Sequence, residues 1–370
     1  MLHNSYLLID TDALRRNIRV LQTQTGTAKL VPVIKDDAYG LGAVPIAKTL
    51  IDCGIDTFAV SHVSEGLELR EAGIDAVIWI LSIPLSFQVD DAVSAGLILP
   101  LAGFHQLETL KASSVRTGRP ITVQLKLDCG LHRIGFLPHE LEKLAAVLKT
   151  ESAWLNVAGT FSHFSDMEPG CMEEEFASFL TMVDSLRSQG IDPGICHISS
   201  SAPLEANARY NLDAVRVGRR LYMDNPVSPL GDIREIASLR TWVADIRTRR
   251  AGEAIAYGNE LRLEKDTPVG VLPVGYGDGL DLNLFHHHAP VLIRGRRAPL
   301  LACCMDQSFL DLSGIDCAVG DDVTFFGYDP DGNFLSSQAI ASLIGANEGC
   351  GLTSSLSARV QRILTHSEPV

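Results

Sequence analysis

The sequence predicts an α/β fold in which an N-terminal (β/α)8 barrel, residues 1–232, precedes a C-terminal mainly β domain, residues 233–370. Between residues 29 and 217, short β-branched runs alternate with helical patterns about every 25 residues. There are eight such runs, which favours a parallel barrel over the alternative, an open doubly wound sheet. After about residue 230 the alternation gives way to strand-like runs separated by Asp-Gly and Gly-Asp turns.

The predicted barrel begins with an amphipathic helix over 11–24, which Asp10 and Thr11 are placed to cap. Each of the eight runs that follow has the length and apolar character of a buried parallel strand. The predicted strands are 30–35, 57–60, 76–81, 97–101, 121–127, 155–160, 195–198 and 214–217. The predicted helices between them are 44–53, 63–72, 87–95, 104–114, 137–149, 172–189 and 202–208.

The C-terminal region shows the shorter spacing of an antiparallel β domain. One helical pattern covers 337–344, and the domain boundary is expected in the turn cluster 226–231. The predicted strands are 239–247, 268–274, 290–293, 299–303, 309–312, 323–327 and 357–363.

Composition excludes several classes of function. The 31 Lys and Arg against 45 Asp and Glu give a formal charge of −14, which disfavours nucleic-acid binding. No apolar run is long enough to cross a membrane. The eight cysteines form no Cys-x-x-Cys pair, and the start of the chain lacks the pattern of an export signal. We therefore expect reduced thiols, no metal site and a cytoplasmic protein.

Polar residues recur where the predicted barrel strands end, the edge at which barrel enzymes place their chemistry. They are Lys35, 126–133, 162–163, 197–201 and 216–218. Taken singly, each has an ordinary interpretation, such as a surface lysine, a structural histidine or a serine that caps a helix. Together they predict one site. A lysine desolvated on a barrel strand suggests Schiff-base chemistry, and a serine-rich helix start opposite it suggests a phosphate site.

At these residues the sequence resembles the alanine racemase family, whose members use pyridoxal 5′-phosphate (PLP) on a barrel followed by a β domain. Six motifs in the family's order carry the resemblance, and they spread over nearly the whole chain. They are Val-Ile-Lys-x-x-Ala-Tyr-Gly-x-Gly at 33–42, Lys-Leu-Asp-x-Gly-x-His-Arg-x-Gly at 126–135, Val-Arg-x-Gly at 215–218, Ala-Tyr-Gly at 256–258, Gly-Tyr-x-Asp-Gly at 275–279 and Cys-Met-Asp-Gln at 304–307.

The resemblance implies a two-base racemase that interconverts L- and D-alanine. Lys35 would carry PLP and move a proton on one face of the substrate's α-carbon, and Tyr257 from the other subunit of a homodimer would serve the opposite face. His163 would lie near that tyrosine and Arg216, and Arg216 would face the pyridine nitrogen of PLP. An always-charged guanidinium there disfavours protonation of that nitrogen and so limits side reactions.

The remaining implied roles concern binding. Tyr39, Ser201, Gly218 and the backbone at Arg219 would hold the phosphate of PLP. Arg133, oriented by Lys126, would hold the substrate and cofactor, and Lys126 is carbamylated in many relatives. Met305 and Tyr276 of the partner subunit would complete the carboxylate site and the entrance.

The sequence departs from the family pattern at several places, among them Ser200-Ser201 where Asn-Ser is usual and Met223-Asp224 where Gly is usual. Asp36-Asp37 follows the lysine where Ala-Asn is usual, and Arg219 stands where an apolar residue is usual. Cys350 takes the position of an active-site tyrosine, which implies a wider or more polar pocket. Alternatives to alanine racemisation therefore stay open at this point: racemisation of serine or another amino acid, a decarboxylase or aldolase of the same fold, or a PLP carrier without catalysis.

Overall fold

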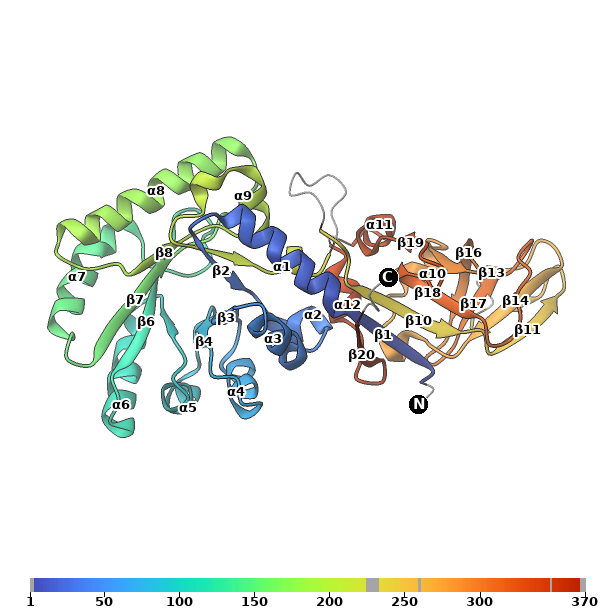
Figure 1. The fold of residues 1–370 in the computed structure, drawn as a ribbon, viewed down its shortest axis with the longest axis horizontal. Helices are drawn as coiled ribbons and strands as arrows, with labels where there is room; N and C mark the ends of the chain where they lie inside the picture. The colour runs from blue at the N-terminus through green and yellow to red at the C-terminus, as the bar shows by residue number, and fades with distance from the viewer. Residues whose placement is uncertain (1–2, 224–232, 259–260, 347, 367–370) are drawn as a thin grey trace.

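The computed structural model describes residues 3–223, 233–258, 261–346 and 348–366. Figure 1 shows two parts side by side, a strand-and-helix part that extends to about residue 223 and a mainly β part formed by the rest of the described chain. Helix α1 runs between them. Within the described ranges no helix is both long and apolar enough to cross a membrane.

The first part is an eight-stranded parallel barrel, as predicted. Its strands are β2 (Lys29–Pro32), β3 (Thr57–Val60), β4 (Val77–Ile80), β5 (Leu99–Leu101), β6 (Ile121–Lys126), β7 (Leu155–Phe161), β8 (Ile195–His197) and β9 (Ala214–Val217). Parallel pairing joins β2 to β9, β3 to β4, and β5 through β6 and β7 to β8. Single bridges join β2 to β3 and β4 to β5, and the Arg216 N–H donates to the Ser199 carbonyl where β9 follows β8.

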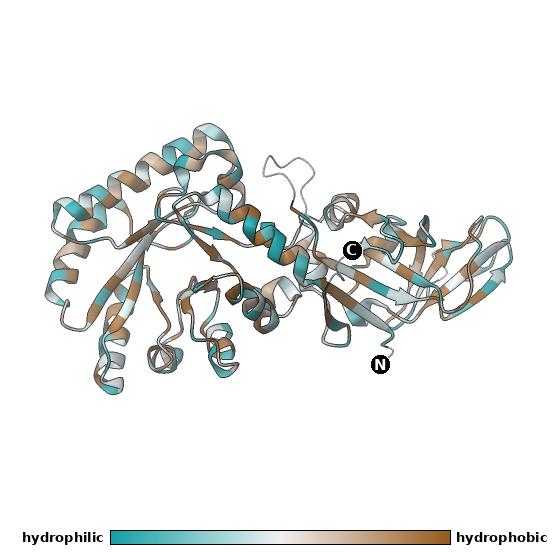
Figure 2. Cartoon of the chain, in the orientation of Figure 1, coloured by the Kyte–Doolittle hydropathy of each residue, from teal (hydrophilic) through white to brown (hydrophobic). Residues whose placement is uncertain are grey.

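Helices surround the barrel strands, which are almost wholly buried. The helices of this part are α1 (Thr11–Thr25), α2 (Lys35–Gly40), α3 (Ala43–Ile51), α4 (Val63–Glu71), α5 (Val89–Ser94), α6 (Leu107–Thr117), α7 (Leu141–Thr150), α8 (Pro169–Ser188) and α9 (Ser201–Ala206). Figure 2 shows both hydrophilic and hydrophobic residues on α1 and α8, as expected of helices with one face against the core. The predicted cap of α1 is confirmed for Asp10, whose Oδ1 accepts from the N–H groups of Asp12 and Ala13, both at 2.9 Å, whereas Thr11 is the first residue of the helix.

The second part is built on one long sheet with the strand order β11-β14-β17-β16-β15-β18-β10-β1-β20. Its strands are β1 (Ser5–Asp10), β10 (Ala237–Trp242), β11 (Asp245–Arg249), β14 (Thr267–Leu272), β15 (Pro290–Ile293), β16 (Arg296–Cys303), β17 (Ser308–Asp311), β18 (Asp322–Tyr328) and β20 (Gln361–Thr365), with β19 (Phe334–Leu335) beside β18 and the hairpin β12 (Ala254–Ile255) and β13 (Leu261–Arg262) apart from it. The helices are α10 (Asn283–His286), α11 (Ser337–Leu343) and α12 (Cys350–Ser354).

Several elements differ from the sequence expectation. The helices α2, α10 and α12 and the hairpin β12–β13 were not predicted, and the predicted strand 30–35 ends at Pro32 as β2. Two further differences concern the long sheet. Strand β1 belongs to the C-terminal sheet, where it pairs antiparallel with β10 and parallel with β20, although the predicted division places residues 5–10 with the barrel. The run 239–247 forms two strands, because the chain leaves β10 after Trp242 and re-enters the sheet at its far edge as β11. The expected boundary cluster 226–231 lies outside the described residues.

Candidate active site

A cavity of about 530 Å³ opens where the barrel strands end, a size typical of small-molecule sites. Eight residues singled out from the sequence line it: Lys35, Tyr39, Arg133, His163, Ser201, Arg216, Gly218 and Arg219. They come from the ends of β2, β6, β7, β8 and β9, which are far apart in the chain. The strand-end rule thus gathers these residues around a single space.

Lys35 stands at the start of an unusual left-handed turn. Residues 36–39 all have φ between 52 and 58° and ψ between 36 and 49°. L-residues pay about 1–2 kcal/mol each for this conformation, and such strain concentrates at functional sites. The turn sets the direction in which Lys35 and Tyr39 leave the backbone toward the cavity.

Two carboxylates hold this turn from the barrel side. Glu65 Oε1 accepts from the Asp36 N–H at 2.6 Å, and Asp37 Oδ1 accepts from the Ala43 N–H at 2.6 Å. The Asp36 carboxylate lies 3.8 Å from Lys35 Nζ. The Asp-Asp departure from the family pattern therefore supplies one structural acceptor and one negative charge beside the lysine.

The C-terminal part holds the same turn from the other side. Arg362 Nε of β20 donates to the Gly40 carbonyl at 2.9 Å, and α12 packs against α2. Gly40 has φ of +82°, and a Cβ there would lie 2.2 Å from the Thr353 carbonyl oxygen.

Lys35 is 37% exposed in this chain, so the burial expected for it from the sequence is only partial.

Arg216 is the most heavily bonded side chain of the cavity. It is 5% exposed and donates through Nη1 to His197 Nδ1 at 2.5 Å and through Nη2 to the Ser162 carbonyl at 2.8 Å and to His163 Nδ1 at 3.1 Å. The guanidinium also lies over the Phe161 ring. Burial lowers the pKa of Arg216 to about 9, so that it keeps its charge at neutral pH.

The two histidines that contact Arg216 are neutral. A nitrogen that accepts from a guanidinium carries no proton, so the ring proton of each histidine resides on Nε2. The Nε2–H of His197 donates to Gln124 Oε1 at 2.6 Å. Burial and the charge of Arg216 lower the pKa of His163 to about 3 and that of His197 well below its ordinary value. His163 is left with an Nε2–H to offer at the cavity.

These neutral histidines predict a loss of stability in mild acid. In the unfolded chain His163 binds a proton below about pH 6.5, whereas in the folded chain its pKa of about 3 keeps it neutral until much lower pH. Because the unfolded state then binds more protons, the free energy of unfolding decreases as the pH falls from 6.5 to 3. Each such group contributes up to about 1.4 kcal/mol per pH unit. We expect His163→Gln to narrow the difference in thermal unfolding midpoint between pH 7 and pH 5. The exposed His139→Gln serves as the control, and an equal change in both variants would contradict the assignment.

Lys126 lies behind the cavity and does not line it. Its side chain is 1% exposed, and Nζ donates to the Leu127 carbonyl at 2.7 Å and lies 3.4 Å from Ser162 Oγ. Burial lowers the pKa of Lys126 to about 8. Within the described part of the chain, the hydrogen bonds join Lys126 to this frame and none to Arg133, which does line the cavity.

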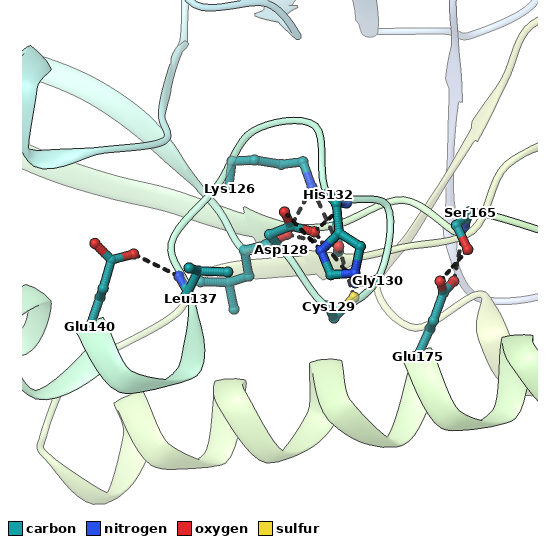
Figure 3. A network of polar contacts seen from close by, with 11 residues as sticks. Lys126, Asp128, Cys129, Gly130, His132, Leu137, Glu140, Ser165 and Glu175 are labelled. Carbon is teal, nitrogen blue, oxygen red and sulfur yellow. Dashed lines mark hydrogen bonds and ion pairs between the residues drawn. The ribbon is translucent and has the colours of Figure 1, made fainter.

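Asp128 holds the loop that carries Arg133, and Glu175 holds the neighbouring segment at Ser165 (Figure 3). Asp128 Oδ1 accepts from the His132 N–H at 2.9 Å and the Gly130 N–H at 3.4 Å. From α8, Glu175 projects to Ser165, whose N–H donates to it at 2.9 Å and whose hydroxyl also donates. A Cβ on Gly130 would lie 2.1 Å from Glu175 Oε1. Glu175 therefore packs between this loop and the segment that follows β7.

Donor groups gather at the end of the cavity formed by β8 and β9. Ser201 Oγ accepts from the Gly218 N–H at 3.3 Å, which leaves the serine proton free to point elsewhere. A Cβ on Gly218 would lie 2.2 Å from Tyr39 Oη, so only glycine admits the tyrosine hydroxyl here. Burial raises the pKa of Tyr39 and keeps its proton in place. With the Arg219 guanidinium beside them, these groups form a donor set suited to an anion.

Cys350 was expected to shape the pocket wall, but the wall at this point is formed by Glu348. Glu348 forms an ion pair with Arg219 through Oε1, and the Cys350 thiol donates to its Oε2 at 3.3 Å. Cys350 begins α12 behind this pair. The position therefore affects the cavity through Glu348.

Other lining residues were missed by sequence reasoning. Ser61 and Ser82 are the first polar residues after β3 and β4, and their hydroxyls lie 3.2 Å apart. The strand-end rule applied to those two strands would have found them. Met167 and Glu348 come from a loop and from the C-terminal part, where that rule gives no signal.

Besides Lys126 and Cys350, three more predicted site residues lie outside this cavity. Tyr257 follows Ala256, which has φ of 61°, between β12 and β13, and it is 79% exposed. Tyr276 and Met305 are 41% and 57% exposed, and the Gly277 N–H binds the Met305 carbonyl at 2.8 Å and so joins the two segments. None of the three lines the cavity of its own chain.

Comparison with known proteins finds the same family in both parts of the chain. The model of the alanine racemase N-terminal domain matches residues 9–226, and that of the C-terminal domain matches residues 236–364. The alanine racemase of Clostridium tetani is 30% identical over 96% of this chain and 94% of its own length. That of Mycobacterium tuberculosis is 33% identical over 86% of each chain.

Solved structures agree over the whole length. The alanine racemase from the D-cycloserine-producing Streptomyces lavendulae superimposes with a TM-score of 0.90 at 28% identity, covering all of this chain and 98% of its own. The Bacillus anthracis alanine racemase with bound L-Ala-P gives 0.90 at 25% identity, covering 99% and 96%. With the barrel, the cavity and these matches considered together, the chain belongs to the alanine racemase family.

Proposed function

We propose that this protein is a PLP-dependent alanine racemase that works by a two-base mechanism. The observation that carries the proposal is the cavity itself, which brings a lysine, a charged arginine bonded to neutral histidines and an anion-binding donor set into one space. The named activity of the relatives supports alanine as the substrate. Serine racemisation, decarboxylation and aldol cleavage are not favoured.

The cavity fits PLP at its phosphate end. This end presents hydroxyl, N–H and guanidinium donors from Tyr39, Ser201, Gly218 and Arg219. Among the described residues that line the cavity, the one carboxylate is that of Glu348. The missing Cβ at Gly218 provides the close backbone approach that a phosphate needs. Lys35, the first residue of α2 just after β2, would bind the aldehyde carbon, and Arg216 would face the pyridine nitrogen.

PLP, when bound, lets an amino acid bear negative charge at its α-carbon once the proton there has left. Arg216 keeps its own proton, because its pKa of about 9 lies above neutral pH and its donors are already engaged. It therefore holds a fixed positive charge without giving up a proton. This arrangement favours return of the proton to the α-carbon over other outcomes.

Inversion of the α-carbon requires one base on each face, since a single base returns the proton to the face from which it removed it. Lys35 serves one face. Tyr257 serves the other from the partner of a homodimer, with the Nε2–H of His163 near it and with Tyr276 and Met305 of that partner at the entrance. The strong exposure of these three side chains supports this assignment. Arg133 helps to hold the substrate and the cofactor, and Lys126 supports its loop from behind.

We also infer that the chain divides functionally near residues 232 and 233, with β1 as the exception that ties the start of the chain to the C-terminal sheet. The free state of all eight cysteines supports a reducing, cytoplasmic location.

Substitution of Gly218 tests the fit to PLP. We expect Gly218→Ala to displace the Tyr39 hydroxyl and to weaken PLP binding about tenfold or more, because the added Cβ has no room. Titration of the apoprotein with PLP, followed by absorbance, measures the effect. Gly351→Ala is the control, since a Cβ there meets nothing within 4 Å. Equal affinity of the two variants would place the phosphate elsewhere.

The activity is tested by incubating PLP-loaded protein with L-alanine and separating the enantiomers. Formation of D-alanine without release of CO2 is the expected result. Release of CO2 would instead establish a decarboxylase, and inversion of L-serine in preference to L-alanine would change the substrate.

A further inference from the structure

Arg219, Glu348 and Cys350 form a cluster in the wall of the cavity. Arg219 begins the short 3-10 helix η5 (Arg219–Leu221) after β9, and Glu348 and Cys350 belong to the C-terminal part. Arg219 Nη1 pairs with Glu348 Oε1, and Glu348 Oε2 accepts from the Cys350 thiol at 3.3 Å. The cluster thus joins the two parts of the chain at the phosphate end of the cavity.

The Arg219–Glu348 pair differs from the ion pair one residue further along. Arg220 and Glu205 are 2% and 12% exposed and form a buried structural pair. Arg219 and Glu348 are 25% and 46% exposed, and both line the cavity. A ligand in the cavity can therefore reach the Arg219–Glu348 pair, and solvent-exposed pairs of this kind are weak enough to be exchanged.

Glu348 is also the acidic residue that lines this cavity in the described part of the chain. The nearby donors, Tyr39, Ser201 and the backbone at Gly218, have no charge of their own. Arg219 is thus the cation of the phosphate end, and a carboxylate already occupies it. A phosphate that binds here must either displace the Glu348 carboxylate from Arg219 or bind beside that carboxylate and be repelled by its negative charge.

We propose that Glu348 competes with the phosphate of the cofactor for Arg219 and so sets the affinity of this protein for PLP. A guanidinium binds a phosphate dianion more strongly than a single carboxylate, so PLP displaces Glu348 from Arg219. The free energy needed to break the Arg219–Glu348 pair is subtracted from the binding free energy of PLP. The Cys350 thiol holds Glu348 in its competing position. Burial raises the pKa of Cys350 to about 11, which keeps the thiol protonated and able to donate. This inference rests on the proposed function, because it presupposes PLP as the cofactor.

Titration of the apoprotein with PLP and with pyridoxal, which lacks the phosphate, tests the proposal without any assay of activity. We expect Glu348→Gln to tighten PLP binding roughly three- to tenfold and to leave pyridoxal binding unchanged. Arg219→Ala is expected to weaken PLP binding alone. In the double variant, most of the gain from Glu348→Gln is lost, because the competition needs Arg219.

Asp90→Asn is the matched control, since it removes an exposed ion pair with Arg116 outside the cavity, and it is expected to change neither affinity. Unchanged PLP affinity in Glu348→Gln, or an equal change for PLP and pyridoxal, would overturn the competition while leaving the proposed function intact. A wild-type protein that binds neither compound would overturn both. The 46% exposure of Glu348 and the similar size of glutamine make misfolding of this variant a poor explanation of any result.

Discussion

Lys35→Ala is expected to abolish racemisation, with kcat reduced at least about a thousandfold. If Lys35 has the two roles proposed for it, the substitution removes both the amine that attaches the cofactor and the base on one face of the substrate. Lys35 is the lysine among the residues that line the cavity, and the buried Lys126 is engaged with the Leu127 carbonyl. A chiral assay of alanine measures the loss, and an absorbance spectrum of PLP-loaded protein checks for attachment to a lysine.

Lys48→Ala is a matched control, because Lys48 is exposed on α3 and lies outside the cavity lining. It is expected to retain full activity and the full spectrum. A Lys35→Ala protein that still shows covalent attachment would reassign the cofactor to another lysine.

Tyr257→Phe is expected to lower kcat for racemisation by about 10²–10⁴-fold, the range that a positioned acid–base group supplies. The change removes one hydroxyl, and PLP binding should survive because Tyr257 is not among the residues proposed to hold the cofactor. A kinetic comparison of both directions, together with a PLP titration, separates the two effects. Weakened PLP binding with unchanged turnover would contradict the assignment of Tyr257 as a base.

The same variant tests whether the site is shared between subunits. Lys35→Ala and Tyr257→Phe chains, unfolded together and refolded in equal amounts, should form mixed dimers in half of the molecules. Each mixed dimer has one intact site of two, so about a quarter of wild-type activity should return. Absence of recovery in refolded mixed dimers would show that Tyr257 does not act on the partner's cavity.

Much of the barrel could be predicted from the sequence because its strands are buried on both sides. A run such as 57–60 has no polar face, and its length and composition identify it by themselves. Strand β1 was missed for the opposite reason. It acquires its partners β10 and β20 from more than 200 residues away, and no local pattern at residues 5–10 records that pairing.

The site residues that follow the ends of the barrel strands could be predicted from the sequence. Those whose position depends on an unusual backbone conformation or on contacts with the C-terminal part could not. Lys35, Arg216 and Ser201 lie where the strand-end rule places them. The left-handed turn at 36–39 depends on support from Glu65 and Arg362, which no local propensity reveals. For the same reason the sequence pointed to Cys350, whereas the cavity wall is made by its neighbour in space, Glu348.

The central claim is that one proton leaves the α-carbon on one face and another arrives on the opposite face. Proton NMR of PLP-loaded protein with L-alanine in D2O, followed by chiral separation, tests it most directly. Loss of the α-proton signal together with formation of deuterated D-alanine is the predicted result. Loss of the signal with the alanine remaining entirely in the L form would show a single working base and contradict the two-base account.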